Sequence, residues 1–301
     1  MSTSQLLFHS DPLAALQEIF PEEDVVRHAV IERIGGMTNT NFKVTLNNRE
    51  YVLRLPGIGS QGMVVRRFEE QNSLYGCKLG ISPNISYFNE ETGIKLTDYI
   101  HHAETLNPTT IQQTDNMRQV ARIFQTLHRS HICFSNDFNV FHELLKYEEL
   151  MVKADGQMYQ GYGDIRDKIF AMEERLNRIG IEMVACHNEA VPENFIKDEN
   201  GKLFIIDWEY AGMNDPCWEI AALFLESNFT EDNQYSFLNF YYDSKIPQTA
   251  HEKIMIYAFL QDMLWAIWTV VKEAKGDDFG TYGIDRFKRG LKTLQKIEGI
   301  N

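Results

Sequence analysis

The first part of the chain alternates between apolar runs and turn-forming residues. Between Asp11 and His28 the apolar side chains recur at helical spacing, which predicts a short amphipathic helix. From Ala29 onward the apolar runs become short, and the pairs Gly35-Gly36 and Asn47-Asn48 separate them. Such pairs form tight turns. The sequence therefore predicts three strands joined by tight turns, with apolar runs at Val30–Ile31, Phe42–Leu46 and Tyr51–Leu55.

The remainder of the chain is predicted to be mostly helical. Apolar residues at helical spacing predict helices over Val64–Leu79, Phe141–Lys153, Asp164–Ile179 and Glu231–Tyr242. Gly180 is well placed to end the third of these helices. The most apolar stretch, Ile254–Val271, contains Gln261 and Asp262, which would be costly at the centre of a bilayer. We interpret this stretch as a buried helix and expect no membrane insertion.

Polar residues that could take part in catalysis or metal binding lie between Cys186 and Glu226. His187, Glu189 and Asn194 come first, and the apolar run Leu203–Ile206 then ends at Asp207. Mg²⁺ prefers oxygen ligands and takes one or two carboxylates from a protein, so Asn194 and Asp207 are candidate metal ligands. Glu189, five residues before Asn194, has the position of an acid that accepts a proton from an attacking hydroxyl. Any one of these residues alone is more often a loop or turn residue.

The combined spacing resembles a known catalytic segment. His-x-acid-x4-Asn, followed by Ile-Asp-Trp-Glu-Tyr at 206–210, is similar to the segment of the choline kinase and aminoglycoside phosphotransferase superfamily. The continuation to Glu226 is most similar to the bacterial choline kinases, and the resemblance runs from about Ile34 to Leu294. The family has Asp where this chain has Glu189. The resemblance implies an α+β, bilobal, protein-kinase-like fold, with a small antiparallel-sheet nucleotide-binding lobe (1–96) and a larger helical lobe (97–301).

The resemblance also assigns nucleotide-binding positions. The loop 35–41 lies where a choline kinase has its nucleotide loop. Thr38 and Asn39 are therefore candidates for donating hydrogen bonds to the phosphates of the nucleotide. Arg54 takes the place of the kinase lysine that holds phosphates, and Glu69 is its expected ion-pair partner. We interpret Arg66, Arg67 and Glu70 as a solvated face. The segment 94–100 resembles the hinge whose backbone contacts adenine.

Aromatic residues near the end of the chain carry the substrate prediction. Trp265 and Trp268 are three residues apart, so both rings project from one helix face. Two tryptophans on an apolar helix are more often ordinary core. In choline kinases, however, matching tryptophans and tyrosines surround the quaternary ammonium of choline. The resemblance implies that Tyr210 and Tyr282 are the tyrosines in this chain. A glutamate matching Glu226 supplies negative charge in those enzymes. Aromatic faces suit a trimethylammonium because it donates no hydrogen bond.

Composition narrows the function further. The 301-residue chain has a formal net charge of −14, which disfavours nucleic acid and favours a small cationic substrate. Its four cysteines are scattered without a C-x-x-C pair, so we expect them reduced. The N-terminus has no basic segment followed by a long apolar core, and we expect a cytoplasmic location. The sequence holds no signal of oligomeric state.

The sequence thus predicts ATP-dependent, Mg²⁺-assisted phosphorylation of choline to phosphocholine. In this interpretation His187 holds the catalytic loop through its ring nitrogens, Glu189 deprotonates the alcohol, and Asn194 and Asp207 hold the metal. The alternatives are a kinase of ethanolamine, an aminoglycoside or an amino sugar, or a nucleotide-binding pseudokinase marked by Glu189.

Overall fold

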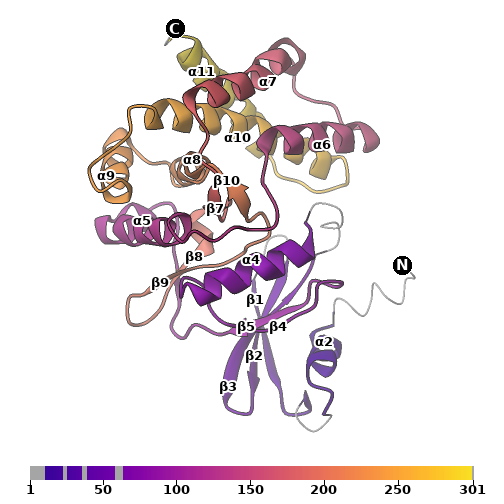
Figure 1. Ribbon diagram of the computed structural model, residues 1–301. Helices are drawn as coiled ribbons and strands as arrows, with labels where there is room; N and C mark the ends of the chain where they lie inside the picture. Colours follow the sequence, from indigo (N-terminus) through magenta and orange to yellow (C-terminus); the bar gives the residue numbers. More distant parts are fainter. Residues whose placement is uncertain (1–10, 23–25, 36–38, 58–63, 300–301) are drawn as a thin grey trace. The chain divides into compact units, whose positions relative to one another are not determined.

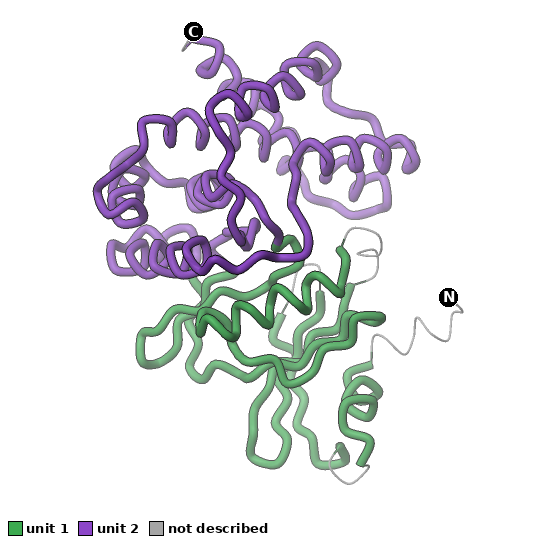
Figure 2. The backbone as a smooth tube through the Cα atoms, in the orientation of Figure 1, with its two compact units in different colours: residues 1–106, 193–211 green, residues 107–192, 212–301 purple. Residues whose placement is uncertain are grey.

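The computed structural model describes residues 11–22, 26–35, 39–57 and 64–299. The chain forms two compact units, which Figure 2 shows in different colours. Unit 1 contains residues 1–106 and 193–211, and unit 2 contains residues 107–192 and 212–301. The segment 193–211 thus belongs to the same unit as the N-terminal strands, although residues 107–192 of the other unit separate it from residues 1–106. The predicted functional lobes, 1–96 and 97–301, stay a prediction.

A five-stranded antiparallel sheet forms the centre of unit 1 (Figure 1). Its order is β1-β2-β3-β5-β4, and helix α4, Arg66–Lys78, crosses one face. The three predicted N-terminal strands are therefore confirmed. The strands are β1 Val30–Gly35, β2 Thr40–Leu46, β3 Arg49–Leu55, β4 Ile85–Phe88 and β5 Lys95–Asp98.

The first helix, α2, is shorter than predicted. It spans Pro12–Ile19, and the Asp11 carboxylate caps it by accepting a hydrogen bond from the Leu13 backbone N–H at 2.9 Å. The helix ends before Pro21 because proline restricts the residue that precedes it and cannot donate a backbone hydrogen bond. The prediction of one helix as far as His28 was wrong. The buried side chains of α2 pack on the apolar core of strands β2, β3 and β5.

A small second sheet completes unit 1. It has the order β6-β8-β9, formed by Glu104–Thr105, Phe195–Lys197 and Leu203–Ile205. The Ile205 backbone N–H donates to the Ile81 carbonyl at 2.8 Å, which joins the β8–β9 hairpin to the segment after α4. The polar end of this hairpin is therefore held next to α4.

Unit 2 is mainly helical. Helix α10 packs against α11, α6, α8 and α7. The predicted C-cap at Gly180 is confirmed, with φ of +100°. A two-stranded pair, β7 Val184–Cys186 and β10 Gly212–Asn214, lies in the same unit. The helices are α5 Thr114–His128, α6 Val140–Lys153, α7 Tyr162–Ile179, α8 Pro216–Glu226, α9 Glu231–Tyr241, α10 Ala250–Glu273 and α11 Tyr282–Glu298.

Helix α10 is the one helix in the described ranges that is long and apolar enough to cross a membrane. Its most apolar window is 78% buried inside the protein, as expected for a core helix. Asp262, in the middle of the helix, forms ion pairs with Arg286 and Arg289 of α11. A carboxylate paired in this way suits a buried helix packed on its own unit.

Candidate active site

The β8–β9 hairpin brings the two candidate metal ligands together. Strand pairing sets Phe195 opposite Ile205, and the Ile206 N–H donates to the Asn194 carbonyl at 2.9 Å. Asp207 follows at once, with φ of +66°, a left-handed conformation that Asp adopts more readily than most residues. Asn194 and Asp207 therefore lie at the same end of one hairpin.

Trp208 anchors this end of the hairpin. Its ring is fully buried, and its Nε1 donates to the Ser82 hydroxyl at 2.9 Å. The ring packs on Gly76 of α4, where an added Cβ would come within 2.3 Å of a ring carbon. Only glycine leaves room for so close an approach. The tryptophan of the Ile-Asp-Trp-Glu-Tyr motif is thus a positioning element between Asp207 and α4.

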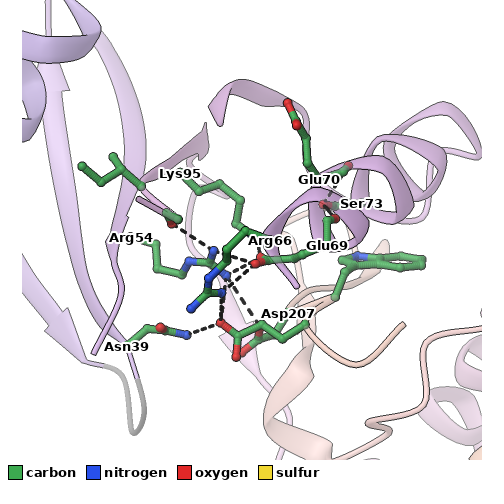
Figure 3. A network of polar contacts seen from close by, with 12 residues as sticks. Asn39, Arg54, Arg66, Glu69, Glu70, Ser73, Lys95 and Asp207 are labelled. Atoms are coloured by element: carbon green, nitrogen blue, oxygen red, sulfur yellow. Dashed lines mark hydrogen bonds and ion pairs between the residues drawn. The ribbon is translucent and has the colours of Figure 1, made fainter. Parts of the chain in front are cut away.

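Beside Asp207, cations from two strands and a helix converge on Glu69 of α4 (Figure 3). The Arg54 guanidinium forms a two-pronged ion pair with Glu69, and its Nη2 lies 3.0 Å from Oε2. Lys95 is the cross-strand neighbour of Arg54, and its Nζ lies 3.0 Å from Glu69 Oε1. The predicted Arg54–Glu69 pair is present. It is nearly inaccessible, since Arg54 is 5% and Glu69 1% exposed.

Arg66 is also part of this cluster, contrary to its interpretation as a solvated residue. Its Nη1 lies 2.7 Å from Glu69 Oε2 and 2.6 Å from Glu209 Oε1. The prediction was wrong because Arg66 lies one turn before Glu69 on α4, so its side chain reaches the same carboxylate. Arg67, by contrast, is exposed.

Glu209 is a site residue that the sequence reasoning did not single out. Its Oε1 accepts hydrogen bonds from Asn39 Nδ2 at 2.9 Å and Arg54 Nη1 at 3.4 Å, besides Arg66. The available signal was its place in the Ile-Asp-Trp-Glu-Tyr motif. Of the two predicted loop residues, Asn39 therefore reaches the cluster, and Thr38 lies outside the described residues.

The surroundings shift the pKa values of the two acids in opposite directions. Burial by itself would raise the pKa of Glu69, but Arg54, Lys95 and Arg66 outweigh it and hold that pKa well below its usual range. Burial and the neighbouring Glu209 carboxylate raise the pKa of Asp207 to about 6. Arg54 Nη1 lies 3.8 Å from Asp207 Oδ1 and opposes this rise only in part. Asp207 thus carries negative charge that its surroundings leave undercompensated.

The oxygen atoms near Asp207 suit a divalent cation. Carboxylate oxygens of Glu69, Asp207 and Glu209 lie within 4.8 Å of one another. Three cations already hold Glu69, and Glu209 Oε1 accepts hydrogen bonds from Asn39, Arg54 and Arg66, which leaves Asp207 as the carboxylate that a metal could use. Asp207 Oδ1 is buried and has no hydrogen-bond partner among the described residues. Such an oxygen fits Mg²⁺, which binds one or two carboxylates.

Unit 2 holds the predicted catalytic loop, which follows β7. Glu219 of α8 accepts hydrogen bonds on Oε1 from the backbone N–H groups of His187, at 3.0 Å, and Asn188, at 3.2 Å. His187 is fully buried, whereas Glu189 is half-buried. Glu219 Oε2 lies 2.5 Å from the buried His128 Nε2, which ties α5 to α8. Asn188 has φ of +70°, a left-handed conformation that Asn, like Asp, adopts more readily than most residues.

The predicted aromatic residues of unit 2 lie on α10 and at the start of α11. Trp265 and Trp268 are in edge contact, with ring centroids 6.0 Å apart. Between Phe259 and Val271 they are the two residues that are half-buried while the others are buried. Their rings therefore keep accessible surface, unlike ordinary core residues. Tyr282 is 39% exposed at the start of α11. Tyr210, the remaining predicted aromatic residue, belongs to unit 1 and is half-buried.

The comparison with protein families identifies the chain. The family model of choline/ethanolamine kinase matches residues 30–290. This chain belongs to the choline/ethanolamine kinase family. Members of the family are phosphotransferases with an alcohol acceptor, and the chain is an enzyme of that kind.

Relatives in the family cover most of the chain. The crystal structure of choline kinase LicA from Streptococcus pneumoniae is 39% identical, has a TM-score of 0.83, and the match covers 93% of this chain and 98% of that one. A further structure is LicA in complex with AMP, at 38% identity, TM-score 0.82, and coverage of 94% and 97%. Protein LicA of Haemophilus influenzae is 32% identical over 88% of this chain and 79% of its own length.

More distant structures confirm the fold class. The structure of an aminoglycoside 2′-phosphotransferase-IIIa has a TM-score of 0.63 at 16% sequence identity, and the match covers 95% of this chain and 97% of that one. A similarity at this level of identity supports the fold and nothing further. The predicted α+β, protein-kinase-like fold of the family is therefore confirmed.

Proposed function

We propose that this chain is a choline kinase, which transfers the γ-phosphoryl group of ATP to the hydroxyl of choline and forms phosphocholine. The observation that carries the proposal is the similarity to choline kinase LicA over nearly the whole of both chains. The LicA complex with AMP supports an adenine nucleotide as phosphoryl donor. ATP is made and used in the cytoplasm, so we expect the protein to act there.

In this proposal the sheet of unit 1 binds the nucleotide. Arg54 supplies a permanent positive charge to the phosphates. Glu69 holds Arg54 in place by the two-pronged ion pair. Asn39, which directly precedes β2, donates to phosphate oxygens; the sequence assigns the same role to Thr38, which lies outside the described residues. Together with the hinge 94–100, these residues make 1–96 the nucleotide-binding lobe and 97–301 the lobe for catalysis and choline.

Asn194 and Asp207 are the residues that would hold Mg²⁺. Bound there, the ion supplies charge neutralisation on the phosphates of ATP. The buried Asp207 Oδ1, which has no hydrogen-bond partner among the described residues, supports this assignment. The chain's own contribution is to fix both ligands at one end of a hairpin that Trp208 anchors.

Glu189 acts as the base that accepts the proton of choline's hydroxyl. His187 and Asn188 hold the loop through their backbone hydrogen bonds to the buried Glu219. Because transfer to the acceptor oxygen involves little covalent work by the protein, orientation of this hydroxyl is the main task of the loop.

The ammonium of choline would contact the rings of Trp265, Trp268, Tyr282 and Tyr210, with Glu226 as the nearby acid. The half-buried state of the two tryptophans supports this role, since a cation needs an accessible ring face.

A second candidate substrate is ethanolamine, because a probable ethanolamine kinase of Arabidopsis thaliana is 23% identical over 80% of this chain. That relative is more distant than either LicA.

An ATP-consumption assay with a panel of acceptors tests the proposal. The purified full chain is given ATP and Mg²⁺ with choline, ethanolamine or an aminoglycoside, and both the ATP consumed and the phosphorylated acceptor are measured. Choline should give the highest kcat/KM. A higher value for ethanolamine or an aminoglycoside would replace the substrate assignment, and no turnover with any acceptor would favour the pseudokinase.

A further inference from the structure

Glu226, the acid expected near the ammonium of choline, is not a free carboxylate. It lies at the end of α8, and Arg286 of α11 forms an ion pair with its Oε1. Arg286 is 4% exposed, so the guanidinium is as inaccessible as an ordinary core residue. The acceptor capacity of Glu226 is therefore partly taken by a residue of the protein itself.

Arg286 belongs to a cluster of two acids and two guanidinium groups within unit 2. Its Nη1 lies 3.3 Å from Asp262 Oδ1. Asp262 is in turn held by Arg289, through contacts of 2.6 and 2.8 Å. The four residues carry no net formal charge. The cluster therefore offers an incoming cation little electrostatic attraction of its own.

Arg286 also covers one of the rings expected to contact choline. The centre of its guanidinium lies 4.8 Å from the centroid of the Tyr282 ring, the geometry of a cation–π contact. Tyr282 lies four residues before Arg286 on α11, which places both on the same helix face. One guanidinium thus engages both the carboxylate and an aromatic ring of the expected choline site.

We infer that Arg286 is a positioning residue that makes the site select a quaternary over a primary ammonium, by occupying the Glu226 carboxylate. This inference rests on the proposed function, and it names the residue that separates choline from ethanolamine. Arg286 acts through Glu226, and it has no part in the transfer of the phosphoryl group.

The physical reason lies in the different needs of the two substrates. The primary ammonium of ethanolamine donates three hydrogen bonds, and leaving water is costly unless protein acceptors replace them. The trimethylammonium of choline donates none and needs only ring faces and space. A carboxylate already bound to Arg286 attracts either cation less than a free one would, but it deprives only ethanolamine of a hydrogen-bond acceptor.

Steady-state kinetics with both substrates test the inference. Wild type, Arg286→Gln and the matched control Arg289→Gln are compared by the ratio of kcat/KM for ethanolamine to kcat/KM for choline. Arg286→Gln should raise this ratio by roughly ten- to a hundredfold, the effect of one hydrogen bond to a charged group. Arg289→Gln should leave it within about twofold, because Arg289 contacts Asp262 and not Glu226. A loss of folded protein lowers the apparent kcat/KM for choline and for ethanolamine by the same factor, so the ratio of the two values does not change.

Failure of the inference and failure of the proposed function give different results. If wild type phosphorylates neither substrate, the proposed function is wrong, and the inference with it. If wild type prefers choline and Arg286→Gln leaves the ratio unchanged, the inference alone is wrong.

A double variant covers the case in which Arg286→Gln does not fold. Arg286→Gln combined with Glu226→Gln removes both charges, so no lone carboxylate stays buried, and such replacements are often tolerated. The ratio should then stay within about threefold of wild type, because no carboxylate is released for ethanolamine. A rise of tenfold or more in the double variant would overturn the inference.

Discussion

Replacing Glu69 with glutamine removes the one carboxylate that Arg54, Lys95 and Arg66 share. Arg54 is 5% and Lys95 8% exposed, so neither cation can turn to water without moving the backbone. Removing one partner of a buried ion pair costs about 3–5 kcal/mol. Arg54 would keep Glu209 at 3.4 Å and Asp207 at 3.8 Å, which places the expected loss near the lower end, about 3 kcal/mol. Such a loss is a large part of a domain's net stability.

Hydrogen exchange followed by mass spectrometry measures this loss in unit 1 alone. Peptides from β3 and α4 report the free energy of opening around Arg54 and Glu69. Glu70→Gln is the matched control, because Glu70 is the next residue on α4 and its side chain has no ion pair among the described residues. Burial and Glu90 raise the pKa of Glu70, so loss of its charge should change stability by less than about 0.5 kcal/mol. Equal opening free energies in the two variants would refute the role given to the cluster.

The same comparison has a defined pH dependence. The pKa of Glu69 in the folded chain lies below its ordinary value of 4.5, so its stabilising effect is fully present above that value. It is lost as the pH falls through the folded pKa. The stability gap between wild type and Glu69→Gln should therefore shrink as the pH falls below about 4.5. A gap as large at about pH 3.5 as at pH 7 would contradict the assignment of the effect to the charge of Glu69.

Three further predictions concern catalysis. Asp207→Asn should lower turnover by orders of magnitude while thermal unfolding shows an intact fold, because a neutral amide binds a divalent cation weakly; near-native turnover would remove Asp207 from the metal site. Glu189→Asp should raise kcat, because the side chain is one methylene longer than the family's Asp and a misplacement of about 1 Å can cost roughly a hundredfold; unchanged activity in Glu189→Ala would show that Glu189 is not the base. Trp268→Ala should raise the KM for choline more than the KM for ethanolamine, since a cation over a ring gains about 0.5–2 kcal/mol; a destabilised protein with an unaltered KM for choline would make Trp268 ordinary core.

Much of the architecture follows from local patterns in the sequence. The strands β1 to β3 were predictable because glycine and asparagine pairs mark their turns, and α10 because its apolar residues continue over many turns. The end of α2 was missed because apolar residues at helical spacing continue past Ile19, whereas Pro21 prevents the backbone from following them. Local steric restriction outweighed the periodic pattern there.

The sequence indicates candidate site residues where they lie in one compact motif, and it does not indicate residues that meet from distant parts of the chain. His187, Glu189, Asn194 and Asp207 lie within one segment, and their spacing is informative. Arg286, in contrast, pairs with Glu226 from 60 residues away, and its sequence context is that of any basic residue on an amphipathic helix. Which charged residues on a helix face the interior depends on the packing of neighbouring elements, and a pattern of charges does not contain that information.

The balance of charge inside the two clusters bears on how the enzyme would choose its substrate. In unit 1 the acids Glu69, Asp207 and Glu209 face three cations, and in unit 2 two acids face two guanidinium groups. Both clusters are formally neutral, so the net charge of −14 resides elsewhere in the chain. Such charge attracts any small cation over long range, weakens with salt, and acts equally on choline and ethanolamine, which carry one positive charge each. Long-range attraction therefore contributes to the rate of encounter. Selectivity must arise from short-range groups that distinguish methyl groups from N–H donors, and in unit 2 these are the accessible tryptophan rings and a carboxylate already occupied by Arg286.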